Sequence, residues 1–383
     1  MTKPKLIRIT TIPLSLEKLL EGQLSFMQQY YDVTAVAAEE ERLSQYGKDN
    51  GVETFHLNLT RKITPIKDFL AVVKLYVFLK KTKPTIVHTH TPKAGIVGMM
   101  AAWLARVPHR LHTVAGLPLM EATGIKRTIL NTVEKLTYYF TTKVYPNSEG
   151  LKTFIETENL THPSKLKIIG TGSSNGIDTT YFDPNLFSET QNEQSRASWK
   201  IPETDFVFIF VGRLVADKGI NELVKAFSAI TTTHKNSTLL LVGPLESELD
   251  PLLPETLKLI SENPKIVTTD YQKDVRPFFA ISNALAFPSY REGFPNVVMQ
   301  AGAMGLPSIV SNINGCNEII EEGVNGLIIP KKNDNALQEA MQKLLTDVSL
   351  QEKLSNQARK SITSRFERMH MWNAIYKEYQ SLS

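Results

Sequence analysis

Two cations that could bind phosphate follow the apolar stretch Phe206–Val211, in the run 212–219. Gly212 would let the backbone turn close to a ligand. Arg213 offers a planar fork for phosphate oxygens, and Lys218, five residues later, offers a point charge. Because a strand-like stretch precedes this run and a helical pattern follows it, both cations are expected at the carboxyl end of a strand. The pattern predicts a phosphate site, and the alternative is a surface turn with solvated charges.

A carboxylate occupies a second run, 288–296, which also follows an apolar stretch. Glu292 lies beside Gly293 and could accept hydrogen bonds from the hydroxyl groups of a sugar. Eight residues after Glu292, within the next helical pattern, comes Gln300. This spacing would let a loop residue and a helix residue line one pocket. The alternative for Glu292 is a structural acid at a helix entry, where the helix dipole favours a negative charge.

A third run, 314–320, follows the apolar stretch 307–310 and opens a helical pattern. Backbone N–H groups at the start of a helix, here at 315–317, can bind an anion. Glu318 is a first-turn acid whose role could be purely structural. The three runs belong to separate strand–loop–helix units, so we expect them to converge on one site at the edge of a sheet.

Histidines mark two strand-like stretches in the first half of the chain. His88 and His90 lie at the end of one such stretch, and His112 lies within the stretch 110–114. His88, His90 and His109 do not show a spacing typical of zinc ligands, and such histidines are more often structural. We therefore predict no metal site.

The elements that would position these residues alternate between strands and helices, which indicates parallel sheets with right-handed crossovers. In the first half we expect strands over 6–10, 33–37, 53–57, 85–88, 110–114, 143–146 and 167–169, with helices over 65–81 and 94–105. In the second half we expect strands over 206–211, 238–242, 265–268, 284–288, 307–310 and 326–329, with helices over 220–230, 251–261 and 297–304.

A polar stretch at 179–200, poor in apolar residues, is interpreted as a linker between two domains. It separates an N-terminal domain, residues 1–184, from a C-terminal domain, residues 185–365. An aromatic-rich helix within 366–383 is expected to return to the N-terminal domain. Two doubly wound α/β domains in series predict ligand binding in a central cleft that both domains face.

The composition is that of a folded chain, since 42% of its 383 residues are hydrophobic and 21% are charged. Cys316 is the single cysteine, so no internal disulfide can form and a reducing compartment is expected. The N-terminal residues lack the apolar core of a signal peptide, and no run is long enough to span a membrane. A cytoplasmic protein is therefore expected.

The net charge of +4 is unevenly distributed, because residues 1–183 contain 23 Lys and Arg against 16 Asp and Glu. A basic first half suits an anionic acceptor or an anionic lipid surface, and ordinary solvated lysines are the alternative. The stretches 66–79 and 125–140 could lie peripherally on the inner face of a cytoplasmic membrane, or simply pack in the core. No nucleic-acid-binding motif is present, so no nucleic-acid partner is expected.

The second half of the chain closely resembles the retaining GT-B glycosyltransferases of family 4, notably those that build bacterial capsule and O-antigen polysaccharides. The resemblance rests on the runs 211–219, 288–295 and 314–320. It implies that Arg213 and Lys218 hold the donor pyrophosphate and that Glu292 holds hydroxyls of the donor sugar. In the family a second acid holds the ribose hydroxyls, and this chain has Gln300 at that position. The other implied donor-binding residues are Gly212, Gly293, Phe294, Asn296, Gly315, Cys316 and Asn317.

The first half matches the family less closely. His88 and His90 resemble its acceptor-side histidine loop, and His112 lies in the stretch that resembles the next strand. Most members have a histidine where this chain has Ala115, and a glycine pair common in the family is replaced by the run 13–16. The resemblance implies acceptor-side positions for the three histidines.

The resemblance also implies a GT-B fold of two Rossmann-like domains and a retaining hexosyl- or N-acetylhexosaminyltransferase. The expected donor is a nucleotide sugar, UDP-linked, and the expected acceptor is a glycan or a polyprenyl-diphosphate-linked glycan. No cofactor or metal would be required, because Arg213 and Lys218 replace it and no Asp-x-Asp motif occurs. Two other classes remain open: a GT-B-fold nucleotide-sugar epimerase and a non-catalytic sugar-binding protein. A hydride-transfer enzyme is disfavoured because no helical pattern follows the glycine-containing run 170–175.

Overall fold

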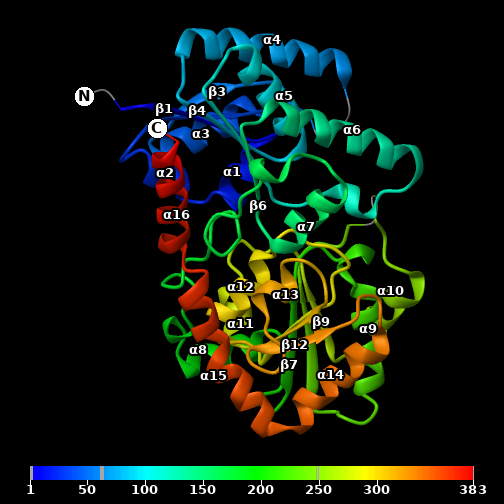
Figure 1. The fold of residues 1–383 in the computed structure, drawn as a ribbon. Helices are drawn as coiled ribbons and strands as arrows, with labels where there is room; N and C mark the ends of the chain where they lie inside the picture. The colour runs from blue at the N-terminus through cyan, green and yellow to red at the C-terminus, as the bar shows by residue number, and fades with distance from the viewer. Residues whose placement is uncertain (1–2, 61–63, 247, 249, 383) are drawn as a thin grey trace. The chain divides into compact units, whose positions relative to one another are not determined.

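The structure of the chain, a computed structural model, describes residues 3–60, 64–246, 248 and 250–382 (Figure 1). It divides into two compact units: unit 1 comprises Met1–Gly176 and Met369–Ser383, and unit 2 comprises Ile177–Arg368. The first unit thus ends at Gly176, whereas the sequence analysis placed its end at residue 184. The difference arises because Ile177 and Phe182 are buried in the hydrophobic core of unit 2.

Unit 1 is built on a six-stranded parallel sheet with the order β3-β2-β1-β4-β5-β6. The strands are β1 (Lys5–Ile9), β2 (Asp32–Ala37), β3 (Glu53–His56), β4 (Ile86–His90), β5 (His109–Val114) and β6 (Lys143–Pro146). The chain builds outward from β1 to β3, then returns to pair β4 with the other side of β1. The strand order therefore reverses between β1 and β4.

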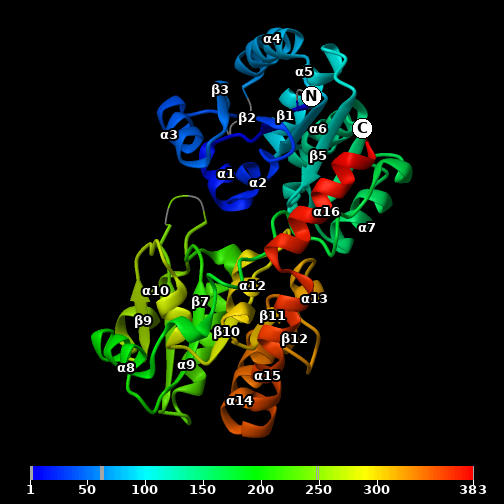
Figure 2. The ribbon, with the colours of Figure 1, turned by 90° about the vertical axis from the view of Figure 1, so that its left-hand side faces the viewer.

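Helices cover both faces of this sheet (Figure 2). One face carries α1 (Pro13–Leu19), α2 (Gln23–Met27), α3 (Glu40–Asn50) and the C-terminal α16 (Arg368–Ser381). The other carries α4 (Pro65–Thr82) and α5 (Pro92–Leu104), with α6 (Gly124–Phe140) beside α5 and α7 (Glu149–Thr157) near β6. Aromatic rings hold α16 in place: Tyr376 stacks on Tyr30 with ring centroids 3.8 Å apart, and Trp372 contacts Phe26 at 5.2 Å.

Unit 2 repeats the architecture, with a six-stranded parallel sheet in the order β12-β11-β10-β7-β8-β9. Its strands are β7 (Phe206–Val211), β8 (Ser237–Val242), β9 (Ile266–Thr269), β10 (Ala284–Phe287), β11 (Ser308–Ser311) and β12 (Gly326–Ile329). Its helices are α8 (Glu189–Ser198), α9 (Ile220–Ile230), α10 (Pro254–Glu262), α11 (Arg276–Ala280), α12 (Asn296–Ala303), α13 (Cys316–Ile319), α14 (Asp334–Thr346) and α15 (Val348–Arg365). The predicted doubly wound, Rossmann-like fold is confirmed in both units.

Two local predictions are wrong. Residues 167–169 form no strand, because the chain there makes only an isolated bridge between Leu166 and Val144. The stretch interpreted as a linker contains α8, which begins with a capping box between Ser188 and Gln191. A surface helix of polar residues therefore occupies part of the predicted connection.

Candidate functional site

The three runs singled out in the sequence follow neighbouring strands of unit 2. The strand order reverses between β7 and β10, which pair directly, and β11 lies beside β10. The run 212–219 follows β7, the run 288–295 follows β10, and 312–315 follows β11. In open α/β sheets, ligands bind outside the carboxyl ends of the strands where the order reverses. The structure therefore brings these loops to the edge of the sheet where a ligand is expected.

The loops after β7 and β10 meet through their backbones at Gly219. This residue has a φ of 72°, and a Cβ placed on it would lie 2.2 Å from the carbonyl oxygen of Pro288. The N–H of Tyr290 donates to the carbonyl of Asp217 at 2.9 Å. The guanidinium of Arg291 also pairs with the Asp217 carboxylate at 2.9 Å. Only a residue without a Cβ permits this approach, so Gly219 keeps the two loops together.

Lys218 and Glu292 form an ion pair between these loops, through Nζ and Oε1. The Ser289 hydroxyl donates to the same carboxylate oxygen at 2.9 Å. The side chains of Lys218 and Glu292 are 20% and 15% exposed, so both charges are shielded but remain within reach of a ligand. The structure thus places the cation that is predicted to bind phosphate in direct contact with the carboxylate that is predicted to bind sugar hydroxyls.

The loop after β11 supports the Glu292 loop from the other side. Gly315 has a φ of 77°, and a Cβ on it would lie 2.3 Å from the carbonyl oxygen of Gly293. The side-chain amide of Asn314 donates to the carbonyl oxygens of both Glu292 and Gly293. These contacts fix the backbone around the carboxylate, which gives the third run a supporting role in the site.

The anion site predicted at the start of α13 is mostly filled by contacts within the protein. The N–H of Gly315 donates to the Glu318 carboxylate at 3.3 Å, and the N–H of Asn317 donates to the carbonyl of Ile313 at 3.1 Å. Of the three N–H groups, only that of Cys316 has no such partner among the described residues. Glu318 therefore caps the start of α13, which is the structural alternative to an anion site. One backbone N–H group remains free, whereas three were predicted to bind an anion.

Two predicted donor-binding residues turn their side chains into the core. Phe294 is buried, with its ring centroid 5.4 Å from that of Phe366. Cys316 is fully buried, and this burial, together with the nearby Glu292 carboxylate, raises the pKa of its thiol well above the usual range. A buried neutral thiol packs like a small apolar side chain. Both residues shape the loops, and only their backbones are available to a ligand.

Arg213 lies at the rim of the site and pairs with Glu246 at 2.6 Å. Its side chain is 48% exposed, so this ion pair contributes little to stability. The ends of β7 and β8 lie close together beside Arg213. A Cβ on Gly243 would lie 2.0 Å from the carbonyl oxygen of Gly212, so only glycine fits there. Because its ion pair is weak, the Arg213 guanidinium can exchange the Glu246 carboxylate for a phosphate at small energetic cost.

The histidines of unit 1 lie on two different faces of its sheet. The register pairs His88 with Leu111 and Thr89 with His112, so His112 points away from His88 and His90. Its Nδ1 lies 2.7 Å from the Thr89 hydroxyl, beneath α5. Burial lowers the pKa of His112 to about 4, so its ring is neutral. The predicted grouping of His112 with the other two histidines is not what the structure shows.

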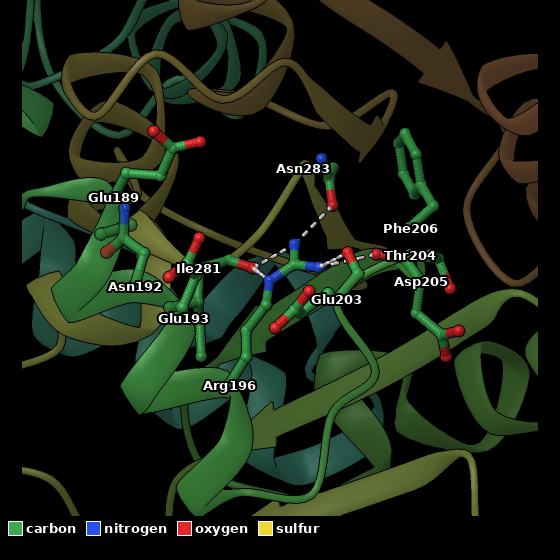
Figure 3. Close-up of a pocket in the computed structure, with 11 residues that line it drawn as sticks. Glu189, Asn192, Glu193, Arg196, Glu203, Thr204, Asp205, Phe206, Ile281 and Asn283 are labelled. Carbon is green, nitrogen blue, oxygen red and sulfur yellow. Dashed lines mark hydrogen bonds between the residues drawn. The ribbon is translucent and has the colours of Figure 1, made fainter.

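An open hollow of about 650 Å³ is lined by residues of α8 and of the stretches at the start of β7 and β10 (Figure 3). It therefore lies at the amino-terminal edge of the second sheet, whereas the three loops follow the carboxyl ends of the strands. Arg196 of α8 reaches into its wall, where it donates to the carbonyls of Ile281 and Glu203 and to the Asn283 side chain. Because protein groups occupy its donors, Arg196 clamps α8 to the sheet. Within the described residues, no group of three or more His, Cys, Asp or Glu side chains could hold a metal ion.

Comparisons with known proteins identify the family and the fold. Residues 191–361 match the family described as glycosyl transferases group 1, and residues 20–148 match that described as glycosyl transferase 4-like. The fold is similar to that of Anabaena Alr3699/HepE, solved in complex with UDP and glucose, with a TM-score of 0.83 and 17% identity over 99% of this chain and 100% of that one.

Curated relatives extend the similarity over the full chain. The capsular polysaccharide biosynthesis glycosyltransferase CapM of Staphylococcus aureus is 33% identical over 100% of this chain and 98% of its own length. The UDP-Gal:alpha-D-GlcNAc-diphosphoundecaprenol alpha-1,3-galactosyltransferase of Escherichia coli is 29% identical over 88% of this chain and 86% of its own. With two Rossmann-like units and the loop motifs in place, the chain belongs to the group 1 family of GT-B glycosyltransferases.

Proposed function

We propose that this glycosyltransferase transfers a hexosyl or N-acetylhexosaminyl group from a UDP-linked donor to a polyprenyl-diphosphate-linked glycan, with retention, in the synthesis of a capsule or O-antigen polysaccharide. The names of the Staphylococcus aureus and Escherichia coli relatives, which refer to capsular polysaccharide synthesis and to a diphosphoundecaprenol acceptor, support the pathway type and the kind of acceptor. The observation that carries the proposal is the ion pair of Lys218 and Glu292, joined by Ser289, at the reversal of strand order in unit 2.

In this proposal, each charge of the ion pair contacts a different part of the donor. Lys218, with Arg213 at the rim, stabilises the negative charge that develops on the leaving diphosphate. Glu292 accepts hydrogen bonds from hydroxyls of the transferred sugar. As the bond from the anomeric carbon to the diphosphate breaks, an acceptor hydroxyl attacks the same face, and its proton passes to a phosphate oxygen. This route keeps the anomeric configuration and needs no enzymatic nucleophile.

The proposal includes metal independence and retention at the anomeric carbon. Fixed cations supply the charge stabilisation that a divalent metal would otherwise give, so activity should persist in excess EDTA. An α-linked donor should give an α-linked product, as measured from the anomeric proton coupling by NMR. Loss of activity in EDTA that magnesium or manganese restores would contradict the first expectation, and a β-linked product the second.

Incubation of the donor with and without an acceptor separates a transferase from an epimerase and from a sugar-binding protein. A panel of nucleotide sugars, screened first for protection against thermal unfolding, identifies the donor because a tight ligand stabilises the folded state. An epimerase would change the donor in the absence of an acceptor. A sugar-binding protein would leave the donor intact whether or not an acceptor was present. Either result would replace the proposed transferase activity.

Gln300 offers a test of ribose binding that is specific to this chain. It lies in α12, is partly exposed, and its side chain has no hydrogen-bond partner among the described residues. Gln300→Leu should weaken donor binding by about 1–3 kcal/mol, because a ribose hydroxyl would be left unpaired. Gln300→Glu, the control, keeps an acceptor and should retain affinity. Unchanged affinity of the leucine variant by calorimetry would remove Gln300 from the site.

Three helices of unit 1 support the proposal of an anionic membrane surface as a partner. None of the described helices is long and apolar enough to cross a membrane. However, α4 exposes Ile66 and Phe69, at 79% and 66%, and α6 exposes Ile125 at 81%. Both helices pack against α5, so α4, α5 and α6 form one helical layer (Figure 1). Lys67, next to Ile66, and Lys126, next to Ile125, are also exposed. Apolar residues beside cations suit insertion into anionic lipid.

Replacing Ile66 and Phe69 with serine should weaken binding to vesicles that contain anionic lipid by roughly tenfold or more per side chain. The rate with a short, soluble acceptor should not change, because the substitutions lie on the surface of α4. Leu186→Ser with Val348→Ser removes exposed apolar side chains of unit 2 and serves as the control. Equal vesicle binding by both double variants, in a sedimentation assay, would exclude this face.

A further inference from the structure

Arg8 is a buried cation in unit 1. It lies in β1, its side chain is 1% exposed, and none of its hydrogen bonds to the described residues is to a carboxylate. The guanidinium instead donates to Nδ1 of His88 at 3.1 Å, to Nδ1 of His90 at 3.4 Å and to the hydroxyl of Tyr379 in α16. Burial of a charge without a counter-ion is costly, so Arg8 is expected to lower the free energy of unfolding.

The guanidinium dictates where both histidines carry their protons. An arginine side chain only donates and stays charged, so each facing Nδ1 must accept. The single proton of each neutral imidazole then lies on Nε2. The second contact of His88 agrees, since its Nε2 lies 2.7 Å from the Thr113 hydroxyl. Burial, followed by the charge of Arg8, also holds the pKa of both histidines well below the usual range.

We propose that Arg8 is a positioning residue that fixes His90 as a neutral Nε2–H donor to a hydroxyl group of the glycosyl acceptor. This inference rests on the proposed function for the identity of the ligand. His90 ends β4 and lines a small cavity together with Asn147. The Oδ1 atom of Asn147 is buried without a hydrogen-bond partner among the described residues. One donor and one acceptor in one cavity match a hydroxyl, which accepts and donates, better than a phosphate oxygen, which only accepts.

The backbone after His90 is also held in an unusual conformation. Thr91 has a φ of 76°, which is rare for a β-branched residue. Its hydroxyl lies 3.2 Å from the backbone nitrogen of Thr11 and 2.7 Å from the Thr11 hydroxyl, at the end of β1. Strained residues of this kind persist where the surroundings determine them, often at functional sites. The chain therefore leaves β4 in a fixed direction at the reversal of strand order in unit 1.

The same contacts exclude His90 as a general base. Nε2 already carries a proton, and protonation of Nδ1 would place an imidazolium against the guanidinium of Arg8. The Glu378 carboxylate is engaged by the Tyr145 hydroxyl at 3.0 Å and by Lys167. The titratable groups that face the two imidazoles are Arg8, Tyr145 and Tyr379 on this side of the sheet and His112 across it.

Nitrogen-15 NMR of the histidine side chains in the full chain tests the tautomers directly. His88 and His90 should both be neutral Nε2–H forms between about pH 5 and 8. Arg8→Met should admit the Nδ1–H form or an imidazolium, whereas Tyr379→Phe, which keeps Arg8, should not. An Nδ1–H His90 in the unaltered protein would overturn the proposal, and this measurement does not depend on the folding of any variant. An equal change in both variants would assign the effect to Tyr379 and also overturn it.

Kinetics test the acceptor contact. His90→Gln keeps an N–H donor near the position of Nε2 and should raise the acceptor KM less than His90→Leu does. His90→Leu should raise that KM by about three- to tenfold, with donor affinity intact, the scale of one lost hydrogen bond. Equal KM values for the two variants would overturn the contact. If the chain bound no nucleotide sugar, the proposed function would fail while the NMR result could still hold, so the two failures are distinguishable.

Discussion

Replacing Lys218 with alanine is expected to lower turnover by roughly 10²–10³, the scale of losing one preorganised contact to a developing charge. The Lys218 ammonium pairs with Glu292 and lies 5.9 Å from the ring centroid of Phe287, which holds it at the carboxyl ends of β7 and β10. Without it, the Glu292 carboxylate would keep the Ser289 hydroxyl but face the donor diphosphate as a second anion. Initial rates at saturating donor and acceptor measure the effect.

Lys225→Ala is the matched control for this substitution. Lys225 also carries an ion pair in unit 2, with Asp334 at 2.6 Å, but the pair lies on the surface and contributes little. The turnover of the Lys225→Ala variant should equal that of the unaltered protein. Lys218→Arg keeps the charge but changes its shape and should fall between the two. A rate for Lys218→Ala within about threefold of the unaltered protein would exclude Lys218 from the chemistry.

The doubly wound fold could be predicted because most of its signal is local. The stretch Phe206–Val211 is apolar throughout, as expected for a parallel strand covered on both faces, and a helical pattern follows it. The order of pairing is not local. Nothing within β7 or β10 specifies that they are neighbours, because helices and two further strands lie between them in sequence. The resemblance to a known family implied Rossmann-like domains, and the pairing of β7 with β10 was found only in the structure.

The α8 helix was missed because composition alone cannot separate a polar surface helix from a linker. None of its residues is buried, so it carries no apolar stripe. A usable signal was nevertheless present, since Ser188 and Gln191 have the spacing of a capping box. Start signals are therefore more informative than hydrophobicity in stretches of this kind.

At the site, residue types were predictable but contacts were not. Lys218 and Glu292 stood out after their strands, yet their pairing joins residues 74 positions apart and requires Gly219 to approach Pro288. Ser289 lies in the run 288–296 but was given no role, because a hydroxyl near a strand end is too common to stand out. Donor binding was assigned to whole residues, although the Phe294 side chain is buried.

Arg8 was missed for a related reason. A single arginine in a predicted strand is usually a solvated residue of an edge or a strand end, because a buried charge is costly. Its burial becomes apparent only when α16 returns to unit 1 and places Tyr379 over β1 and β4. Sequence separation, here 371 positions, hides such a network from any local pattern.

Gly219→Ala is expected to lower turnover by about 10²-fold, the cost of displacing a catalytic group by roughly 1 Å. A Cβ at this position would lie 2.2 Å from the carbonyl oxygen and 2.8 Å from the carbonyl carbon of Pro288. Backbone atoms cannot rotate away as a side chain can, so the loop after β10 must shift. This shift would move Glu292 relative to Lys218. The left-handed φ of 72° adds a conformational cost of about 1–2 kcal/mol, seen as a lower free energy of unfolding.

Gly323→Ala is the control that separates the cost of the left-handed backbone conformation from the effect of displacing the loop after β10. Gly323 has a φ of 70°, almost that of Gly219, but a Cβ on it would meet nothing within 4 Å. This variant should lose stability by about the same 1–2 kcal/mol and keep full turnover at temperatures well below its unfolding midpoint. Gly219→Ala should lose both. If it kept full turnover as well, the approach of Gly219 to Pro288 would not position the ion pair, and Ser289 and Asn314 would have to hold Glu292 without it.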